Sequence, residues 1–138
     1  MLVEKIQPGD TKTVFIYTTC RDWEEARSMG LLCIEKKLAF SSDFWEINSI
    51  YPWQGVLQEV VQYMLMLSTE KGLSPELVAY IATIHSYTNP MIAEIDTALI
   101  NAPYKLLMDS TLHNSQEYVT EDTTEQKNID ESGIEKLK

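Results

Sequence analysis

The chain has 138 residues, which is the length of one average domain. Apolar residues make up 44% and charged residues 23%, as in ordinary globular proteins, so collagen-like, wholly disordered and membrane-spanning classes are excluded. Its 21 acidic and 11 basic residues give a formal charge of −10, which repels nucleic-acid phosphates and anionic membrane surfaces. We therefore expect no nucleic-acid partner and no membrane partner.

The cysteine content and the first residues bear on the compartment. Only Cys20 and Cys33 are present, too few for a disulfide framework. The opening sequence MLVEKIQPGD lacks a basic segment followed by an apolar run, so it does not predict a signal peptide. These features favour a cytoplasmic location.

The first predicted elements are a strand and a helix. Residues 13–19 are β-branched and aromatic, which favours a strand. Asp22 is a plausible N-cap for the helix that follows. The residues expected on the sheet-facing stripe of this helix are Ala26, Gly30, Cys33, Ile34 and Lys37.

A long β-hairpin is predicted next, with strands at residues 38–51 and 56–69 and a turn at Pro52 to Gly55. Its second strand is apolar on both faces. One face carries Val61, Tyr63, Leu65 and Leu67, and the other carries Val60, Met64 and Met66 together with Gln62 and Ser68. A strand of a small antiparallel domain normally keeps one solvated face, so we expect another subunit to cover part of it.

The remaining elements complete a known order. Ser74 is predicted to cap a helix that ends before His85, residues 91–100 alternate as a strand, and Asn101 precedes a short helix. The sequence thus predicts an α+β fold of the ferredoxin-like β-α-β-β-α-β type, with its helices on one sheet face.

The domain itself is expected at residues 13–112, after an N-terminal extension at 1–12. Residues 113–138 are acidic and poor in aromatic residues, which predicts a flexible tail. A docking tail for a basic partner is the alternative. His113, at the edge of this tail, is expected to be solvated.

Four segments together resemble one family. Ser49 to Gly55 matches the S-x-Y-x-W-x-G motif of the CutA divalent-cation-tolerance proteins, and Glu35 to Ala39 resembles their E-x-K/R-L-A motif. His85 to Pro90 resembles H-P-Y-x-x-P, and Asn101 to Tyr104 takes the place of the family's C-terminal tyrosine helix. The resemblance covers roughly residues 13–110 in the right order.

This resemblance implies a PII-like subunit that forms a homotrimer through its long hairpin strands. It also implies a cytoplasmic protein that is linked to metal tolerance, binds copper or another divalent cation, and is not an enzyme. The residues it places at an inter-subunit cleft or interface are Tyr51, Trp53, Glu59, Gln62 and Tyr87.

The chain also departs from the family pattern. Phe40-Ser41-Ser42 stands where the family usually has a cysteine, and Ser86 replaces the proline after His85. Charged positions of the family are taken by Gln62, Ser68 and Met91. We therefore expect a diverged member that keeps the trimer while its cleft chemistry is altered.

His85 and Cys20 are the candidate ligands for a divalent metal, Cu or Zn. A metal site needs several ligands, so a hydrogen-bonded structural histidine is the alternative for His85. Cys33 lies on the predicted buried stripe of the first helix, where a buried thiol is expected.

Two further function classes stay open. One is a PII-like signalling or scaffold trimer that holds a small organic ligand or a partner protein in its clefts. The other is an enzyme, whose only acid–base candidates are Glu59, Glu94 and Asp96. No nucleophile–base pair and no glycine-loop, zinc-protease or nucleophile-elbow motif supports an enzyme.

Overall fold

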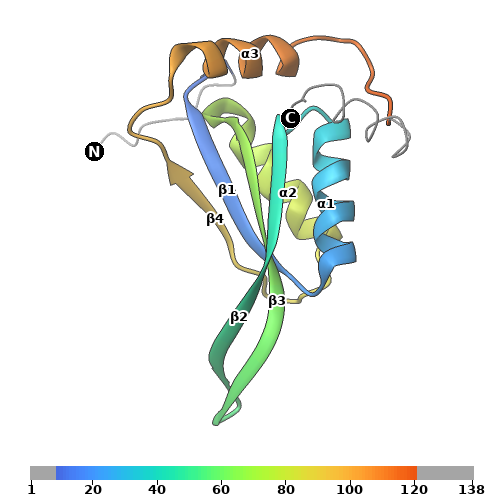
Figure 1. The fold of residues 1–138 in the computed structure, drawn as a ribbon, viewed down its shortest axis with the longest axis vertical. Helices are drawn as coiled ribbons and strands as arrows, with labels where there is room; N and C mark the ends of the chain where they lie inside the picture. Colours follow the sequence, from blue (N-terminus) through green and yellow to red (C-terminus); the bar gives the residue numbers. More distant parts are fainter. Residues whose placement is uncertain (1–8, 121–138) are drawn as a thin grey trace, which may run out of the picture.

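A computed structural model describes residues 9–120, so the predictions for residues 1–8 and 121–138 lie outside the described residues. The elements are β1 (Thr13–Cys20), α1 (Trp23–Glu35), β2 (Ser41–Trp53), β3 (Val56–Glu70), a 3-10 turn (Lys71–Leu73), α2 (Ser74–Ile84), β4 (Ile92–Asp96) and α3 (Ala102–Leu112). The sheet has four antiparallel strands in the order β2-β3-β1-β4 (Figure 1). This order and pairing confirm the predicted ferredoxin-like α+β fold.

Helices α1 and α2 pack against one face of the sheet and enclose the core (Figure 1). The fully buried core members include Ile16, Leu65, Leu67, Ala26, Cys33, Leu77 and Ile81. The predicted stripe of α1 is right at Ala26, Gly30 and Cys33, and the structure adds Met29. It is wrong at Lys37, because α1 ends at Glu35 and Lys37 has a left-handed φ of 61° that leads the chain away.

Of the two predicted N-caps, the structure confirms the one of α1 and contradicts the one of α2. Asp22 caps α1 as predicted, since its Oδ1 accepts a hydrogen bond from the Glu25 amide at 2.9 Å. Ser74 was predicted to cap α2, and this is wrong: Leu73 takes the N-cap position after the 3-10 turn. The Ser74 hydroxyl instead donates to Oε1 of Glu94 at 2.6 Å.

The predicted hairpin is confirmed, and its turn consists of Gln54 and Gly55. Their φ angles of 52° and 81° are those of a two-residue turn that suits the right-handed twist of the strands. The tip of this hairpin projects well beyond the rest of the sheet (Figure 1). We call the projecting part, residues 47–61, the arm.

Strand β4 is shorter than the predicted strand at residues 91–100, because its partner, β1, has no residues left to pair with beyond Thr13. Asp96 pairs with Val14, and β1 begins one residue earlier, at Thr13. Thr97 then bonds the Thr13 carbonyl through its side chain at 2.9 Å, and Leu99 is 86% exposed.

The sheet face opposite α1 and α2 is largely uncovered, and we call it the open sheet face. Helix α3 lies across the end of the sheet away from the hairpin tip (Figure 1). It covers that end of the open sheet face, where the Tyr104 hydroxyl donates to Oγ of Ser68 at 3.4 Å. The half-buried or exposed side chains of the open sheet face are Phe15, Tyr17, Trp45, Ile47, Val60, Met64, Met66 and Ile95. Tyr17 and Trp45 meet edge to face across β3, with ring centroids 6.5 Å apart.

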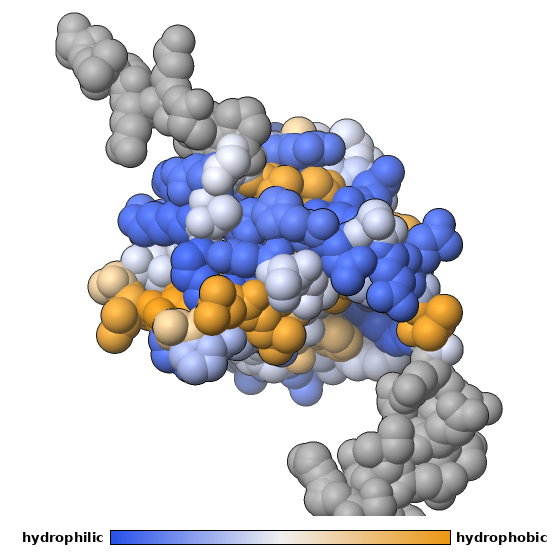
Figure 2. All heavy atoms as spheres, turned by 90° about the horizontal axis from the view of Figure 1, so that it is seen from above, coloured by the Kyte–Doolittle hydropathy of each residue, from blue (hydrophilic) through white to orange (hydrophobic). Residues whose placement is uncertain are grey.

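The end of the molecule that carries α3 has a more hydrophilic surface than the open sheet face. Figure 2 views this end and shows hydrophilic atoms over most of it, with hydrophobic atoms gathered in separate patches. Leu106 and Leu107 of α3 are 70% and 55% exposed. No helix within residues 9–120 is long and apolar enough to cross a membrane.

Replacing Gly30 with alanine is expected to destabilise the fold. A Cβ at this position would lie 2.8 Å from both Cβ and Oγ of Ser42, so α1 and β2 would have to separate. Overpacking costs about 1–3 kcal/mol, which outweighs the roughly 1 kcal/mol that alanine gains over glycine in a helix. Urea unfolding measures the difference.

Gly9→Ala is the matched control, because a Cβ at Gly9 would meet nothing within 4 Å. Adding Ser42→Gly to Gly30→Ala should recover part of the lost stability. A Gly30→Ala protein as stable as the wild type would show that the helix is not held at this distance.

Candidate inter-subunit cleft

A cleft of about 870 Å³ lies where the arm leaves the body of the sheet. Its lining residues are Thr19, Tyr51, Trp53, Gln58, Gln62, Ser86, Tyr87, Thr88, Asn89 and Met91. Four of the five predicted cleft residues meet here: Tyr51, Trp53, Gln62 and Tyr87. Glu59 does not line this cleft, because it alternates onto the other face of β3 from Gln62.

The lining contains residues that sequence reasoning missed. Gln58 lies on the same face of β3 as Gln62, so strand alternation could have identified it. Thr19 is the last open-face residue of β1, and only the pairing of β1 with β3 brings it here. Met91 and Gln62, which replace charged residues of the family pattern, both line the cleft, whereas Ser68 lies under α3.

Gln62 and Tyr87 join the two walls of the cleft. The Tyr87 hydroxyl donates to Oε1 of Gln62 at 2.7 Å, which links the loop after α2 to β3. Burial raises the pKa of Tyr87 above its ordinary value, so this hydroxyl keeps its proton at neutral pH.

His85 holds the loop that carries Tyr87. Its Nδ1 accepts a hydrogen bond from the Tyr87 amide at 3.1 Å, so the ring proton lies on Nε2, which is 3.0 Å from Oγ1 of Thr18. The side chain of His85 is fully buried. Both ring nitrogens are therefore engaged inside the subunit, as in the structural alternative for this residue.

Glu25 fixes the same loop from α1. One carboxylate oxygen accepts from the Arg21 amide at 2.7 Å, and the other accepts from the Ser86 amide at 2.8 Å. Burial opposes the charged form, but these backbone hydrogen bonds hold the pKa of Glu25 below its ordinary value. The carboxylate thus ties the β1–α1 connection to the wall of the cleft.

The Cys20 side chain is also enclosed. It is fully buried, and burial, followed by the charge of Glu25, raises the pKa of its thiol to about 12. Metal ligation requires the thiolate, which is scarce at neutral pH with such a pKa. Within residues 9–120, no three or more His, Cys, Asp or Glu side chains are grouped to hold a metal ion.

The carboxylates of β4 lie on one face, as the alternation predicts, and they are paired with lysines. Lys71 Nζ lies 2.5 Å from Glu94 Oε2 and 3.4 Å from Asp96 Oδ1. Lys12 Nζ also reaches Asp96, at 3.5 Å. These pairs, with the Ser74 hydroxyl on Glu94, tie β4 to the start of α2.

His113 was expected to be solvated, and this is only partly right. Its side chain is 55% exposed, but Nε2 lies 2.9 Å from Oε1 of the buried Glu70. Burial and the neighbouring Asp109 raise the pKa of Glu70, while His113 opposes that rise. This contact holds the end of α3 to the end of β3.

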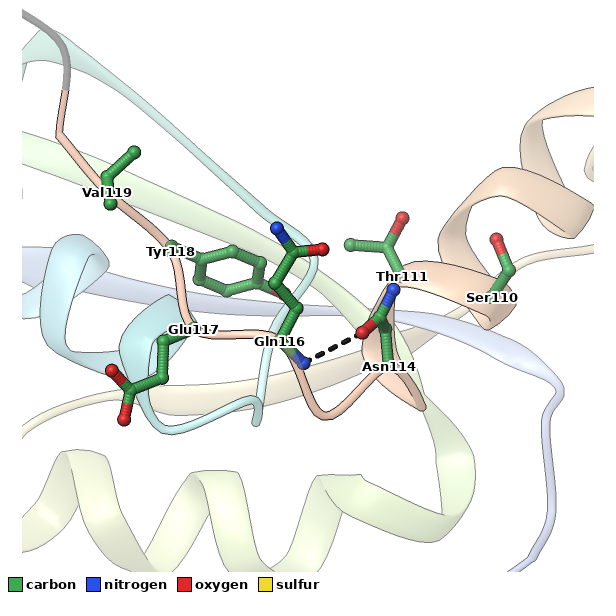
Figure 3. Close-up of a pocket in the computed structure, with 7 residues that line it drawn as sticks. All are labelled: Ser110, Thr111, Asn114, Gln116, Glu117, Tyr118 and Val119. Carbon is green, nitrogen blue, oxygen red and sulfur yellow. Dashed lines mark hydrogen bonds between the residues drawn. The ribbon is translucent and has the colours of Figure 1, made fainter.

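The described part of the predicted tail, residues 113–120, contacts the body of the protein. Lys37 Nζ donates to the Gln116 carbonyl and lies 3.8 Å from the centroid of the Tyr118 ring. A hollow of about 410 Å³ lies along this segment. Figure 3 shows the residues that line it, with the Gln116 amide donating to Asn114 Oδ1, at 2.7 Å. The hollow does not adjoin any predicted site residue.

Comparison with known proteins identifies the family. Residues 14–111 match the model of the CutA1 divalent ion tolerance protein. The divalent-cation tolerance protein CutA of Thermococcus kodakarensis is 33% identical over 101 residues, which are 73% of this chain and 97% of that protein. Protein CutA of Bos taurus is 28% identical over 97 residues, and the match spans only 54% of its length.

A solved structure agrees in fold. The periplasmic divalent cation tolerance protein CutA of Archaeoglobus fulgidus matches with a TM-score of 0.71 and 27% identity, over 73% of this chain and 99% of the other. The cleft, the projecting arm and the sheet order described above therefore lie within the matched region. The chain belongs to the CutA1 divalent ion tolerance protein family.

Proposed function

We propose that this protein acts as a homotrimer in divalent-cation tolerance, with neighbouring subunits covering its open sheet face. The observation that carries the proposal is the apolar surface of the open sheet face, which no other part of the described chain covers except at the end under α3. Trp45 of β2 and Ile95 of β4 are 43% and 46% exposed at two sides of that face. Monomeric proteins rarely expose a continuous apolar surface of this kind.

The second face of the arm, opposite the one that carries Trp53, supports the same proposal. Ile50, Leu57 and Val61 are 67%, 74% and 52% exposed on the face opposite Trp53. An isolated two-stranded hairpin is marginally stable in water, so a projecting apolar arm needs a surface to pack on. A neighbouring copy supplies such a surface, because in a ring of three copies each subunit packs one surface on a different surface of the next.

For the metal, we propose that Cu²⁺ or Zn²⁺ binds weakly at His85 and Cys20. A metal at His85 must displace the Tyr87 amide or the Thr18 hydroxyl, and a metal at Cys20 must remove a proton from a buried thiol. Both steps oppose binding.

Isothermal titration of Cu²⁺ and of Zn²⁺ into the full chain tests this, with sedimentation measuring the mass of the same sample. We expect a trimer with weak, non-saturating metal heats. His85→Asn is the informative variant, since its side-chain oxygen still accepts from the Tyr87 amide. Tight saturable binding that is lost in His85→Asn would overturn the weak-site proposal, and a monomer would overturn the trimer.

A second candidate is a PII-like trimer that binds a small ligand or a partner protein in the cleft. The uncharged lining of the cleft favours it. A role without catalysis fits a family known for cation tolerance and stays a prediction. Cytoplasmic location also stays a prediction, and the Archaeoglobus relative is described as periplasmic.

A further inference from the structure

The lining of the cleft is unusual for this chain in having no charged side chain. Charged residues make up 23% of the sequence, yet all ten lining residues are aromatic, amide, hydroxyl or thioether side chains. The charges of Glu25 and Arg21 act on Tyr87 from behind the wall, and both are already paired: Arg21 with Asp22 at 3.0 Å, and Glu25 with two backbone amides. An ion that enters the cleft therefore loses water without gaining a counter-charge.

Aromatic rings supply the apolar surface of the cleft. Tyr51 and Trp53 lie two residues apart on one face of β2 and are 38% and 60% exposed in the single subunit, so their rings face the cleft that a neighbouring subunit would border. Tyr87 lies on the other wall, where its hydroxyl donates to Gln62 and its backbone N–H donates to Nδ1 of His85. Rings at these positions suit a flat ligand, because aromatic pairs gain most from stacked or edge-to-face contact.

Gln62 supplies an unused hydrogen-bond donor. The residue as a whole is 9% exposed, and its Oε1 accepts a hydrogen bond from the Tyr87 hydroxyl. Within residues 9–120, its Nε2 has no hydrogen-bond partner in the protein and is open to solvent at the cleft. An amide N–H group that is open at a cleft wall and has no partner in the protein can donate to a ligand carbonyl in place of water.

We infer that this cleft binds an uncharged planar ring that carries an amide or carbonyl group. The ring stacks on Tyr51 and Trp53, and its carbonyl oxygen accepts a hydrogen bond from Nε2 of Gln62. The volume of about 870 Å³ lies within the range of small-molecule sites. This inference deepens the second candidate function and rests on it, because a neighbouring subunit would border the cleft.

Three probes with the same ring and different charges test the inference: benzamide, benzoate and benzamidine. Ligand-observed NMR on the full-length protein measures the affinity for each. We expect benzamide to bind about tenfold more tightly than either ion, because only the ions lose hydration without compensation. Equal or tighter binding of an ion, or binding of none of the three, would overturn the inference.

Gln62→Leu removes the amide at nearly constant volume and should abolish the preference for benzamide. Gln116→Leu, a glutamine outside the cleft, should keep it, and Trp53→Ala should weaken all three probes. Unchanged preference in Gln62→Leu would count against the assigned donor. Sedimentation of the same samples separates the two proposals. A trimer that does not prefer benzamide overturns only the proposed ligand class. A monomer that does prefer benzamide overturns only the proposed trimer.

Discussion

Met64→Asp is expected to convert the proposed trimer to a monomer. Met64 lies at the centre of the open sheet face, paired with Trp45 on β2 and Thr19 on β1. Its side chain is half buried within one subunit, so the aspartate carboxylate stays hydrated in a monomer. Within an interface between copies, the same carboxylate would be buried without a partner, at a cost of several kcal/mol.

Sedimentation velocity measures this change, and far-ultraviolet circular dichroism shows whether the subunit remains folded. Leu32→Asp is a matched control, since Leu32 is 36% exposed on α1, on the opposite side of the sheet. The control should remain a trimer. If Met64→Asp also sediments as a trimer, the open sheet face is not the interface.

His85→Ala is expected to lower the free energy of unfolding by about 2–4 kcal/mol. The substitution removes a fully buried ring and leaves the Thr18 hydroxyl, which is also fully buried, without its partner. It also frees the Tyr87 amide, so the cleft wall loses its anchor.

Urea unfolding in the presence of EDTA measures this loss without any metal contribution. His85→Asn should lose less stability than His85→Ala, because it keeps an acceptor for the Tyr87 amide. A loss below about 0.5 kcal/mol in His85→Ala would contradict a structural role and leave the ring free for metal binding.

The parts of the fold that sequence predicted are those specified by neighbouring residues. The Asp22 cap bonds an amide three residues away, and the Gln54-Gly55 turn is set by its own backbone angles. The errors arose from distant contacts. The Ser74 hydroxyl donates to Glu94, twenty positions along the chain, and does not cap α2. Strand β4 stops where its partner β1 begins, at Thr13.

The same distinction holds at the cleft. The motifs predicted that Tyr51, Gln62 and Tyr87 share a site, and the structure brings them together. Sequence could not show that His85 uses both ring nitrogens, because Thr18 lies 67 positions away. Glu59 is a different case, because the alternation predicted for residues 56–69 already places it on the face of Val61, opposite Gln62, and the motif-based grouping overlooked this.

The two thiols have a practical consequence for experiments on this protein. Cys20 and Cys33 are fully buried, and burial raises the pKa of each to about 12. Alkylating reagents attack the thiolate, so labelling of the native protein requires that the core opens. The rate of cysteine modification therefore reports opening around β1 and α1, with no engineered probe.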